Sequence, residues 1–346
     1  MKKILKYMFR WIAATIISIL LLSLFSLAYY HPPIAVVQPN GITNFKYIPD
    51  AYWTFMSEGT GYGKTDHLGY NNAYYPDCSD PDIVFAGSSH MEALQVPQDK
   101  NCVYLLNEKL ALDDIADNDF KCLNLGISGH FFEVITGNFP YIAKEFKGAK
   151  YIVLEAFEVK YSSEMLDDML EEKFHSPMSK RSWIYEATQR IPFFRWARKK
   201  IGDTFSKKNT DAEGSVAGES APSQTEDMDG YTEKMNLLLG KIAELSHENG
   251  MEPIILLHER FSEDKDGNIV KEMDETYKNA FKACCKTNGV KVIDVSDAMV
   301  AAYKEDFAYS YGFSDGVPGE GHLNETGHRI IAETVYQYIN EWEERK

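Results

Sequence analysis

The sequence predicts an α/β protein in which a parallel five-stranded sheet lies between two layers of helices. Short apolar segments alternate with amphipathic helical segments from residue 82 to the carboxyl end, and this alternation is typical of parallel sheets. Two of the helical segments end at Asn-Gly pairs, Asn249-Gly250 and Asn288-Gly289, which are good carboxyl-cap signals. A chain of 346 residues with 44% hydrophobic residues is long enough to bury a full core.

The strands are expected where runs of β-branched and aromatic residues continue without alternation, because parallel strands are buried on both faces. The helices are expected where apolar residues recur at helical spacing. The expected strands are Asp82–Ala86, Lys121–Leu125, Tyr151–Ala156, Pro253–Leu257 and Val290–Val295. The expected helices are Val103–Leu112, Glu133–Phe146, Tyr231–Glu248, Asp274–Thr287 and Glu325–Glu343.

Residues 11–30 carry no charged side chain. As a helix they would be about 30 Å long, which is enough to cross a bilayer. Four basic residues lie in residues 1–10, so we expect this tail to be cytoplasmic and the body to lie outside the cytoplasm, at the cell membrane. The alternative is a signal peptide cleaved near Ser26-Leu27-Ala28, but the apolar run exceeds the usual signal core. We favour an uncleaved anchor.

The net charge is −16, and removing the four basic residues of the first 30 leaves −16 − 4 = −20 for the exterior. Such an acidic surface would repel phosphate backbones, so no nucleic-acid partner is expected. Among Cys78, Cys102 and Cys122 any pairing is open, whereas Cys284 and Cys285 are expected to pack within a helix. No spacing of Cys or His suggests a metal site, and no cofactor is indicated.

Two regions lie outside the alternating pattern. Residues 31–80 are expected to be an irregular lead-in that packs on the domain formed by residues 81–346; its segment Lys64–Asn71 could line the cleft or cover an edge. Residues 161–229 are an insertion, and residues 206–229 within it are expected to be disordered because they carry almost no apolar side chains. The basic, aromatic stretch Arg190–Lys200 could lie on a membrane or contact a partner. A packed helix with a solvated face is the slightly favoured alternative.

The first expected strand ends abruptly in Gly87-Ser88-Ser89-His90. A glycine and small residues allow a sharp turn at the carboxyl edge of the sheet, where open α/β sheets place their chemistry. A serine on such a rigid turn suits a nucleophile. The alternative is that Ser88 and Ser89 only cap the following helix.

Two further motifs stand at suitable places: Leu123–Gly129 after the second strand, and His322-Leu323-Asn324-Glu325-Thr326-Gly327 before the last helix. Together with the serine turn, and in this order, they resemble the SGNH/GDSL hydrolase superfamily. The resemblance implies a flavodoxin-like three-layer sandwich with strand order 2-1-3-4-5. It also implies Ser89 as nucleophile, His322 as base, and the amides of Ser89 and Gly129 as oxyanion-hole donors. His328 is expected to be structural, and His90 to shape the cleft or contact substrate.

Two positions depart from the family pattern. The family places the triad Asp three residues before the His, where this chain has Gly319; we therefore expect Asp315 to face His322, with Glu320 in reserve. The family also places an oxyanion-hole Asn after the third strand, where this chain has Glu158. An ionised carboxylate donates no hydrogen bond, so Glu158 would have to be protonated or serve substrate binding.

The expected function is an extracytoplasmic serine esterase or O-acyltransferase acting on acyl, most readily acetyl, esters of cell-surface polysaccharide. Membrane-anchored proteins of alginate O-acetylation and teichoic-acid D-alanylation are similar and act beside a multi-spanning acyltransferase, so such a partner is expected for a transferase. A plain esterase or lipase is a second enzyme hypothesis. The alternative of another class is a degenerate, non-catalytic domain that binds glycan or the membrane partner.

Overall fold

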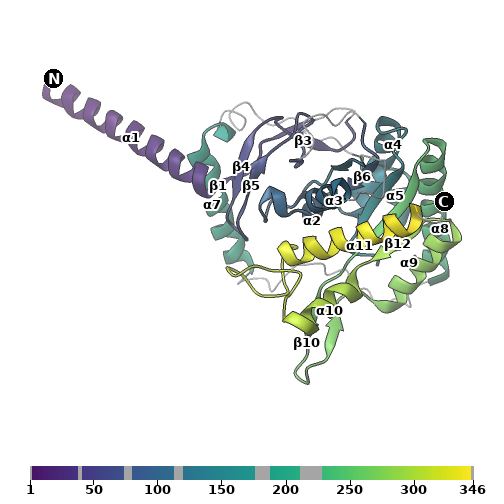
Figure 1. The fold of residues 1–346 in the computed structure, drawn as a ribbon. Coiled ribbons are helices and arrows are strands. Elements are labelled where there is room, and N and C mark those ends of the chain that lie inside the picture. The colour runs from purple at the N-terminus through teal and green to yellow at the C-terminus, as the bar shows by residue number, and fades with distance from the viewer. Residues whose placement is uncertain are drawn as a thin grey trace.

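The computed structural model describes residues 2–37, 41–73, 80–112, 120–175, 188–210 and 228–343. Its centre is a five-stranded parallel sheet (Figure 1). The strands are β6 (Ile83–Ala86), β7 (Cys122–Asn124), β8 (Tyr151–Ala156), β9 (Glu252–Leu257) and β12 (Lys291–Asp294). Their spatial order, β12-β9-β8-β6-β7, is the order 2-1-3-4-5 read from the other edge. The predicted fold class and strand order are confirmed.

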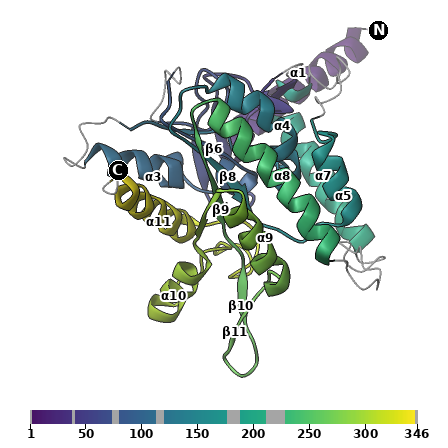
Figure 2. The same ribbon diagram turned by 90° about the vertical axis from the view of Figure 1, so that its right-hand side faces the viewer.

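Helices cover both faces of the sheet, as Figure 2 shows from the side. Alternate strand residues divide between two cores: Val84 and Ile152 belong to one, and Ile83 and Tyr151 to the other, because successive side chains of a strand point to opposite faces. The first core is closed by α4 (Phe132–Glu145), α8 (Met228–Glu248) and α9 (Glu275–Thr287). The second is closed by α3 (Cys102–Ala111), α10 (Ser296–Asp306) and α11 (Glu325–Glu343).

Several elements were not expected from the sequence. They are α2 (Ser89–Glu92), the short 3₁₀ helix η1 (Gln98–Lys100), α5 (Ser163–Leu170), α10, and a hairpin of β10 (Phe261–Glu263) and β11 (Ile269–Lys271). Of the segment expected to be disordered, residues 206–210 lie in α7 (Pro192–Thr210) and residues 228–229 in α8. The rest of that segment lies outside the described residues.

The amino-terminal helix α1 (Lys2–Tyr29) projects from the body of the protein (Figure 1). Its part from Lys3 to Tyr29 is long and apolar enough to cross a membrane, and its side chains are almost entirely unburied by the rest of the protein. By length and composition it is a candidate membrane span.

The lead-in is more ordered than expected. β1 (Tyr30–His31), β4 (Tyr52–Phe55) and β5 (Gly61–Lys64) form an antiparallel sheet, and β2 (Ala35–Val37) pairs with β3 (Phe45–Tyr47). After β5 the chain covers the edge of the central sheet: the side chain of Asn72 bonds the backbone N–H and C=O of Asn124 at the end of β7 (2.8 and 2.9 Å). The β4–β5 hairpin is the part of this region that reaches the candidate site.

Candidate active site

The turn after β6 separates the roles of its two serines. The hydroxyl of Ser88 accepts the backbone N–H of His90 at 3.3 Å, so Ser88 is the N-cap of α2. Ser89 is the first helical residue and remains partly exposed. Gly87 is required before them, because a Cβ there would collide with Met91 and with the carboxylate of Glu155. Ser88 therefore stabilises the turn, and Ser89 is left available for chemistry.

His322 lies beside Ser89, although 233 residues separate them in the chain. Its Nε2 is 3.0 Å from Ser89 Oγ. The next residues hold the loop: the side chain of Asn324 donates to the carbonyls of Tyr309 (2.8 Å) and Gly312 (3.0 Å) and caps α11 through the N–H of Thr326 (2.9 Å). The His-Leu-Asn motif thus combines the imidazole beside Ser89 with the amide that fixes its loop.

The carboxylate that faces His322 belongs to Glu58, in the turn of the β4–β5 hairpin. Its Oε2 lies 2.7 Å from His322 Nδ1, and its Oε1 accepts the backbone N–H of His322 at 2.8 Å. With Nδ1–H donated to Glu58, Nε2 is free to accept the proton of Ser89. Burial raises the pKa of Glu58, but the hydrogen bonds from His322 outweigh it and leave that pKa below its usual value. Ser89, His322 and Glu58 therefore have the arrangement of a catalytic triad.

The expectation that Asp315 faces His322 is wrong. Asp315 is exposed, and its Oδ1 accepts the backbone N–H of Gly59 at 3.2 Å. It therefore contacts the hairpin next to Glu58 rather than the imidazole. The reserve candidate Glu320 is also exposed and contributes its own backbone N–H to the carbonyl of Val317 (3.1 Å).

The loop before His322 leaves room for the glutamate. Gly321 has a positive φ of +82°, and a Cβ at this position would collide with Glu58 Oε1. The Pro/Gly-rich segment does loop out, as expected, but the space that it leaves beside His322 is filled by a residue from the other end of the chain.

The second motif lies along the same edge as the serine turn. The N–H of Ile127 donates to the carbonyl of Gly87 at 3.0 Å, and Gly126 packs so closely on α2 that a Cβ would collide with the backbone N of Glu92. Gly129 follows with φ +79°, exposed and with open space around its Cβ position. Its amide and that of Ser89 stay the candidate oxyanion donors.

Glu158 is exposed and lines a cavity of about 330 Å³ together with Phe157, Lys160 and Arg260. Its carbonyl accepts the hydroxyl of Tyr161 at 2.6 Å. Phe157, the residue before it, packs against His90 with 4.7 Å between ring centroids. The structure therefore brings Phe157 of this motif to His90, which adjoins His322.

A buried polar chain beneath the serine turn was not expected. Glu155, in β8, accepts the backbone N–H of Ser88 and bonds Nε2 of His258 (2.8 Å), whose Nδ1 lies 2.6 Å from the hydroxyl of Tyr311. All three side chains are buried. A glutamate inside an otherwise apolar strand was the sequence signal for it, because a buried carboxylate needs hydrogen-bond partners.

His90 lies between this chain and the triad, and it is buried rather than open to substrate. Its ring centroid is 5.4 Å from that of His258 and 5.2 Å from that of His322. Its Nδ1 accepts the backbone N–H of Leu323 at 3.3 Å. Burial, and then the neighbouring histidines, lower the pKa of His90 well below its usual value, which keeps the ring neutral and able to accept. His90 thus ties α2 to the loop that carries His322.

Glu92, at the end of α2, is a second buried carboxylate. Tyr47 of β3 and Ser128 donate their hydroxyls to it. Burial raises the pKa of Glu92 despite these hydrogen bonds. His328 is fully buried, accepts the backbone N–H of Cys102 at 3.3 Å, and has a pKa lowered to about 3 by burial, which agrees with a structural role.

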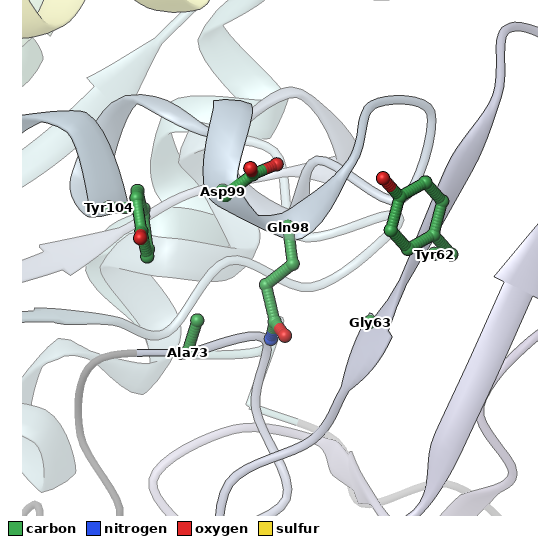
Figure 3. Close-up of a pocket in the computed structure, with 6 residues that line it drawn as sticks. All are labelled: Tyr62, Gly63, Ala73, Gln98, Asp99 and Tyr104. Carbon is green, nitrogen blue, oxygen red and sulfur yellow. The ribbon is translucent and has the colours of Figure 1, made fainter.

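Two other cavities can be compared with the triad. One of about 400 Å³ adjoins it and is lined by Gly59, Phe313, Asp315 and Asn324 among others. The other, of about 510 Å³, lies between Tyr62 and Tyr104, with Gln98 and Asp99 between them (Figure 3). The lining of neither cavity includes Ser89, His322 or Glu58; the first includes their chain neighbour Gly59, and the second does not. In the second cavity the side chain of Gln98 is already bonded to the backbone of Lys64.

Within the described ranges, no group of three or more His, Cys, Asp or Glu side chains is arranged to hold a metal ion. Cys102, Cys122, Cys284 and Cys285 are buried free thiols, so Cys102 and Cys122 are not paired with each other. Cys78 lies outside the described residues.

No family model and no curated protein matches the sequence. Among solved structures, the chain is similar to a lipolytic G-D-S-L family protein from Veillonella parvula (16% identity, 74% of this chain and 96% of that one, TM-score 0.38). It is also similar to an acetyl xylan esterase (14%, 74% and 98%, TM-score 0.39) and to a salicylyl-acyltransferase of a tetracycline biosynthetic pathway (11%, 77% and 56%, TM-score 0.37). The fold assignment rests on the strand order of the central sheet.

Proposed function

We propose that the protein is a serine-dependent enzyme of acyl-ester chemistry in which Ser89 is the nucleophile, His322 the base and Glu58 the acid. The observation that carries the proposal is the continuous chain of contacts from Ser89 Oγ to His322 Nε2 (3.0 Å) and from His322 Nδ1 to Glu58 (2.7 Å). A serine hydroxyl needs a base to remove its proton during attack, and that base needs a fixed tautomer.

In the proposed mechanism, Ser89 Oγ attacks the ester carbonyl while His322 Nε2 takes its proton. Glu58 stabilises the imidazolium that forms, and the amides of Ser89 and Gly129 donate to the oxyanion. The tetrahedral intermediate collapses, His322 returns the proton to the leaving alcohol, and an acyl-enzyme remains. Water or a sugar hydroxyl, deprotonated by His322, then attacks the acyl-enzyme and frees Ser89.

The proposed substrates are acyl esters, most readily acetyl esters, of cell-surface polysaccharide. The proposed location of the body is outside the cytoplasm, with α1 as the membrane anchor; basic residues before the apolar segment support this orientation. One spanning helix cannot carry an acyl group across a membrane, so an O-acyltransferase role would require a multi-spanning partner.

The test is intact-mass labelling of the full chain, in detergent, with a fluorophosphonate serine probe. We expect one adduct in the wild type and none in Ser89→Ala. Ser88→Ala is the matched control: it removes the neighbouring hydroxyl, costs about 1 kcal/mol of cap stability, and should keep the adduct. An adduct that persists in Ser89→Ala would refute the proposal. Folded protein without any adduct would favour the non-catalytic glycan-binding alternative.

A second measurement, on wild-type protein that reacts with the probe, separates hydrolysis from transfer. An acetylated chromogenic ester is supplied with and without a sugar acceptor. Acetylated sugar formed at the expense of acetate supports a transferase, and unchanged acetate release supports an esterase.

A further inference from the structure

The segment of residues 188–201 differs in charge from the rest of the chain. It contains five basic residues and no acidic one, in a protein whose net charge is −16. Its residues from Pro192 onwards form the first part of α7. The position of α7 in the fold indicates why basic residues gather there in an otherwise acidic protein.

One side of α7 is attached to the end of the anchor helix. α7 packs against α1 and β1, and Figure 1 shows it beside the point where α1 meets the body. The buried guanidinium of Arg195 donates to the carbonyls of Pro32 and Pro33 and lies 3.3 Å from Nδ1 of His31. Lys199 lies 5.2 Å from the ring centroid of Tyr30. These contacts hold α7 at the level where the chain leaves α1.

Another side of α7 is open. Phe194, Arg198 and Ile201 follow each other at i, i+4 and i+7 and therefore share one face of the helix. Phe194 is 38% exposed and Ile201 57%, and Arg198 is also exposed. Just before the helix, Arg190 and Ile191 are exposed as well. Apolar and basic side chains on one face of a helix are typical of helices that lie in a membrane interface.

We infer that this face of α7 lies on the anionic surface of the bilayer that α1 crosses, and so forms a second membrane contact of the protein. The inference rests on the anchor that the proposed function includes. We assign the lipid surface as the binding partner of this face, because the face adjoins the end of the anchor helix and its charge is opposite to that of anionic headgroups.

The contact has a consequence for the triad. Tyr30 pairs with Phe55 of the hairpin that carries Glu58, and paired Cα atoms are about 5 Å apart. Three residues from Phe55 to Glu58 span at most about 11 Å, so the Cα of Glu58 lies within about 16 Å of that of Tyr30, the residue that follows α1. A domain attached through both α1 and α7 would hold its triad close to the bilayer, where membrane-proximal esters are its natural substrates.

The experiment is hydrogen exchange of residues 188–201 in the full chain, reconstituted into lipid discs. Discs of phosphatidylcholine alone are compared with discs that also contain phosphatidylglycerol. Each basic residue near an anionic surface strengthens binding about fivefold. We therefore expect slower exchange in the anionic discs, and the double variant R190E/R198E, which reverses the two basic residues of this side, should reduce that protection at least about 25-fold.

The matched control is K265E/K304E, which makes the same charge change on exposed residues of the β10–β11 turn and α10, far from α1 (Figure 1). It should keep the protection. Equal exchange in both kinds of disc, or equal loss in both variants, would overturn the inference; protection only after a membrane protein partner is added would do so too. Hydrogen exchange needs no turnover and can also be measured in Ser89→Ala. A failed membrane contact can therefore be distinguished from a failure of the proposed chemistry, which the fluorophosphonate probe tests.

Discussion

Replacing Glu58 by Gln tests the triad most directly. The amide keeps the shape of the side chain. Glu58 accepts the Nδ1–H of His322 through Oε2 (2.7 Å) and its backbone N–H through Oε1 (2.8 Å), so in Gln one of these two donors would face an NH2 group, which is itself a donor. The imidazolium also loses its counter-charge. Loss of a triad acid with geometry kept costs about 10⁴ in kcat, or about 5.4 kcal/mol at 1.36 kcal/mol per tenfold. Glu58 and His322 are 30% and 28% exposed, so water can replace part of the lost interaction. We expect kcat to fall about 10³–10⁴-fold.

The assay is hydrolysis of a chromogenic acetyl ester, together with the rate of fluorophosphonate labelling. Asp315→Asn is the informative comparison, because it weakens one exposed hydrogen bond to Gly59 (3.2 Å), worth about 0.5–1.5 kcal/mol, and should slow turnover about 2–10-fold. Glu320→Gln is the control and should change nothing. A Glu58→Gln protein within threefold of wild type, beside an Asp315→Asn protein reduced about 10³-fold, would refute the assignment.

Three further changes have expected outcomes. Gly321→Ala should lower kcat at least about tenfold with a smaller effect on KM, because its Cβ would displace Glu58; unchanged kinetics would show that the loop adapts. Glu155→Gln should destabilise the fold by about 1–3 kcal/mol, measured by thermal unfolding, because an NH2 group would replace one of the two oxygens that bond the backbone N–H of Ser88 and Nε2 of His258; a stability equal to wild type would contradict that network. Glu92 has a raised pKa in the folded state, so its contribution to stability is fully present below its unfolded pKa of about 4.3 and is lost as pH rises through the folded pKa. Glu92→Gln should therefore flatten the fall in unfolding free energy above about pH 4.3, and an unchanged pH profile from denaturant titrations would contradict the shift.

The architecture could be predicted because its signals are local in the chain. Strand Tyr151–Ala156 and helix Glu325–Glu343 have the predicted bounds, and the other expected elements shift by up to three residues. A buried parallel strand must be apolar throughout, and a surface helix must repeat its apolar residues every third or fourth position. Helix α10 was missed because its segment, Ser296–Asp306, lies directly after a strand and contains few apolar residues in a regular pattern.

Two residues of the site could also be predicted. Ser89 and His322 belong to short motifs in which the neighbouring residues stabilise the local backbone. Ser88 caps α2, and Asn324 clamps the loop that holds His322. The polar chain of Glu155, His258 and Tyr311 was missed because its members lie in three separate segments, and only the buried glutamate is unusual in its own surroundings.

The sequence by itself determined the parallel sheet, its helices, the candidate membrane helix and the two motifs that hold the serine and the histidine. Each of these depends on residues near one another in the chain. Only the tertiary structure decided which carboxylate completes the site. Glu58 is 264 residues from His322 and is surrounded by no motif; the β4–β5 hairpin brings it there, and Asp315, much nearer in sequence, bonds that hairpin instead. A hydrogen bond depends on distance in space, and spacing along the chain restricts that distance only within short segments.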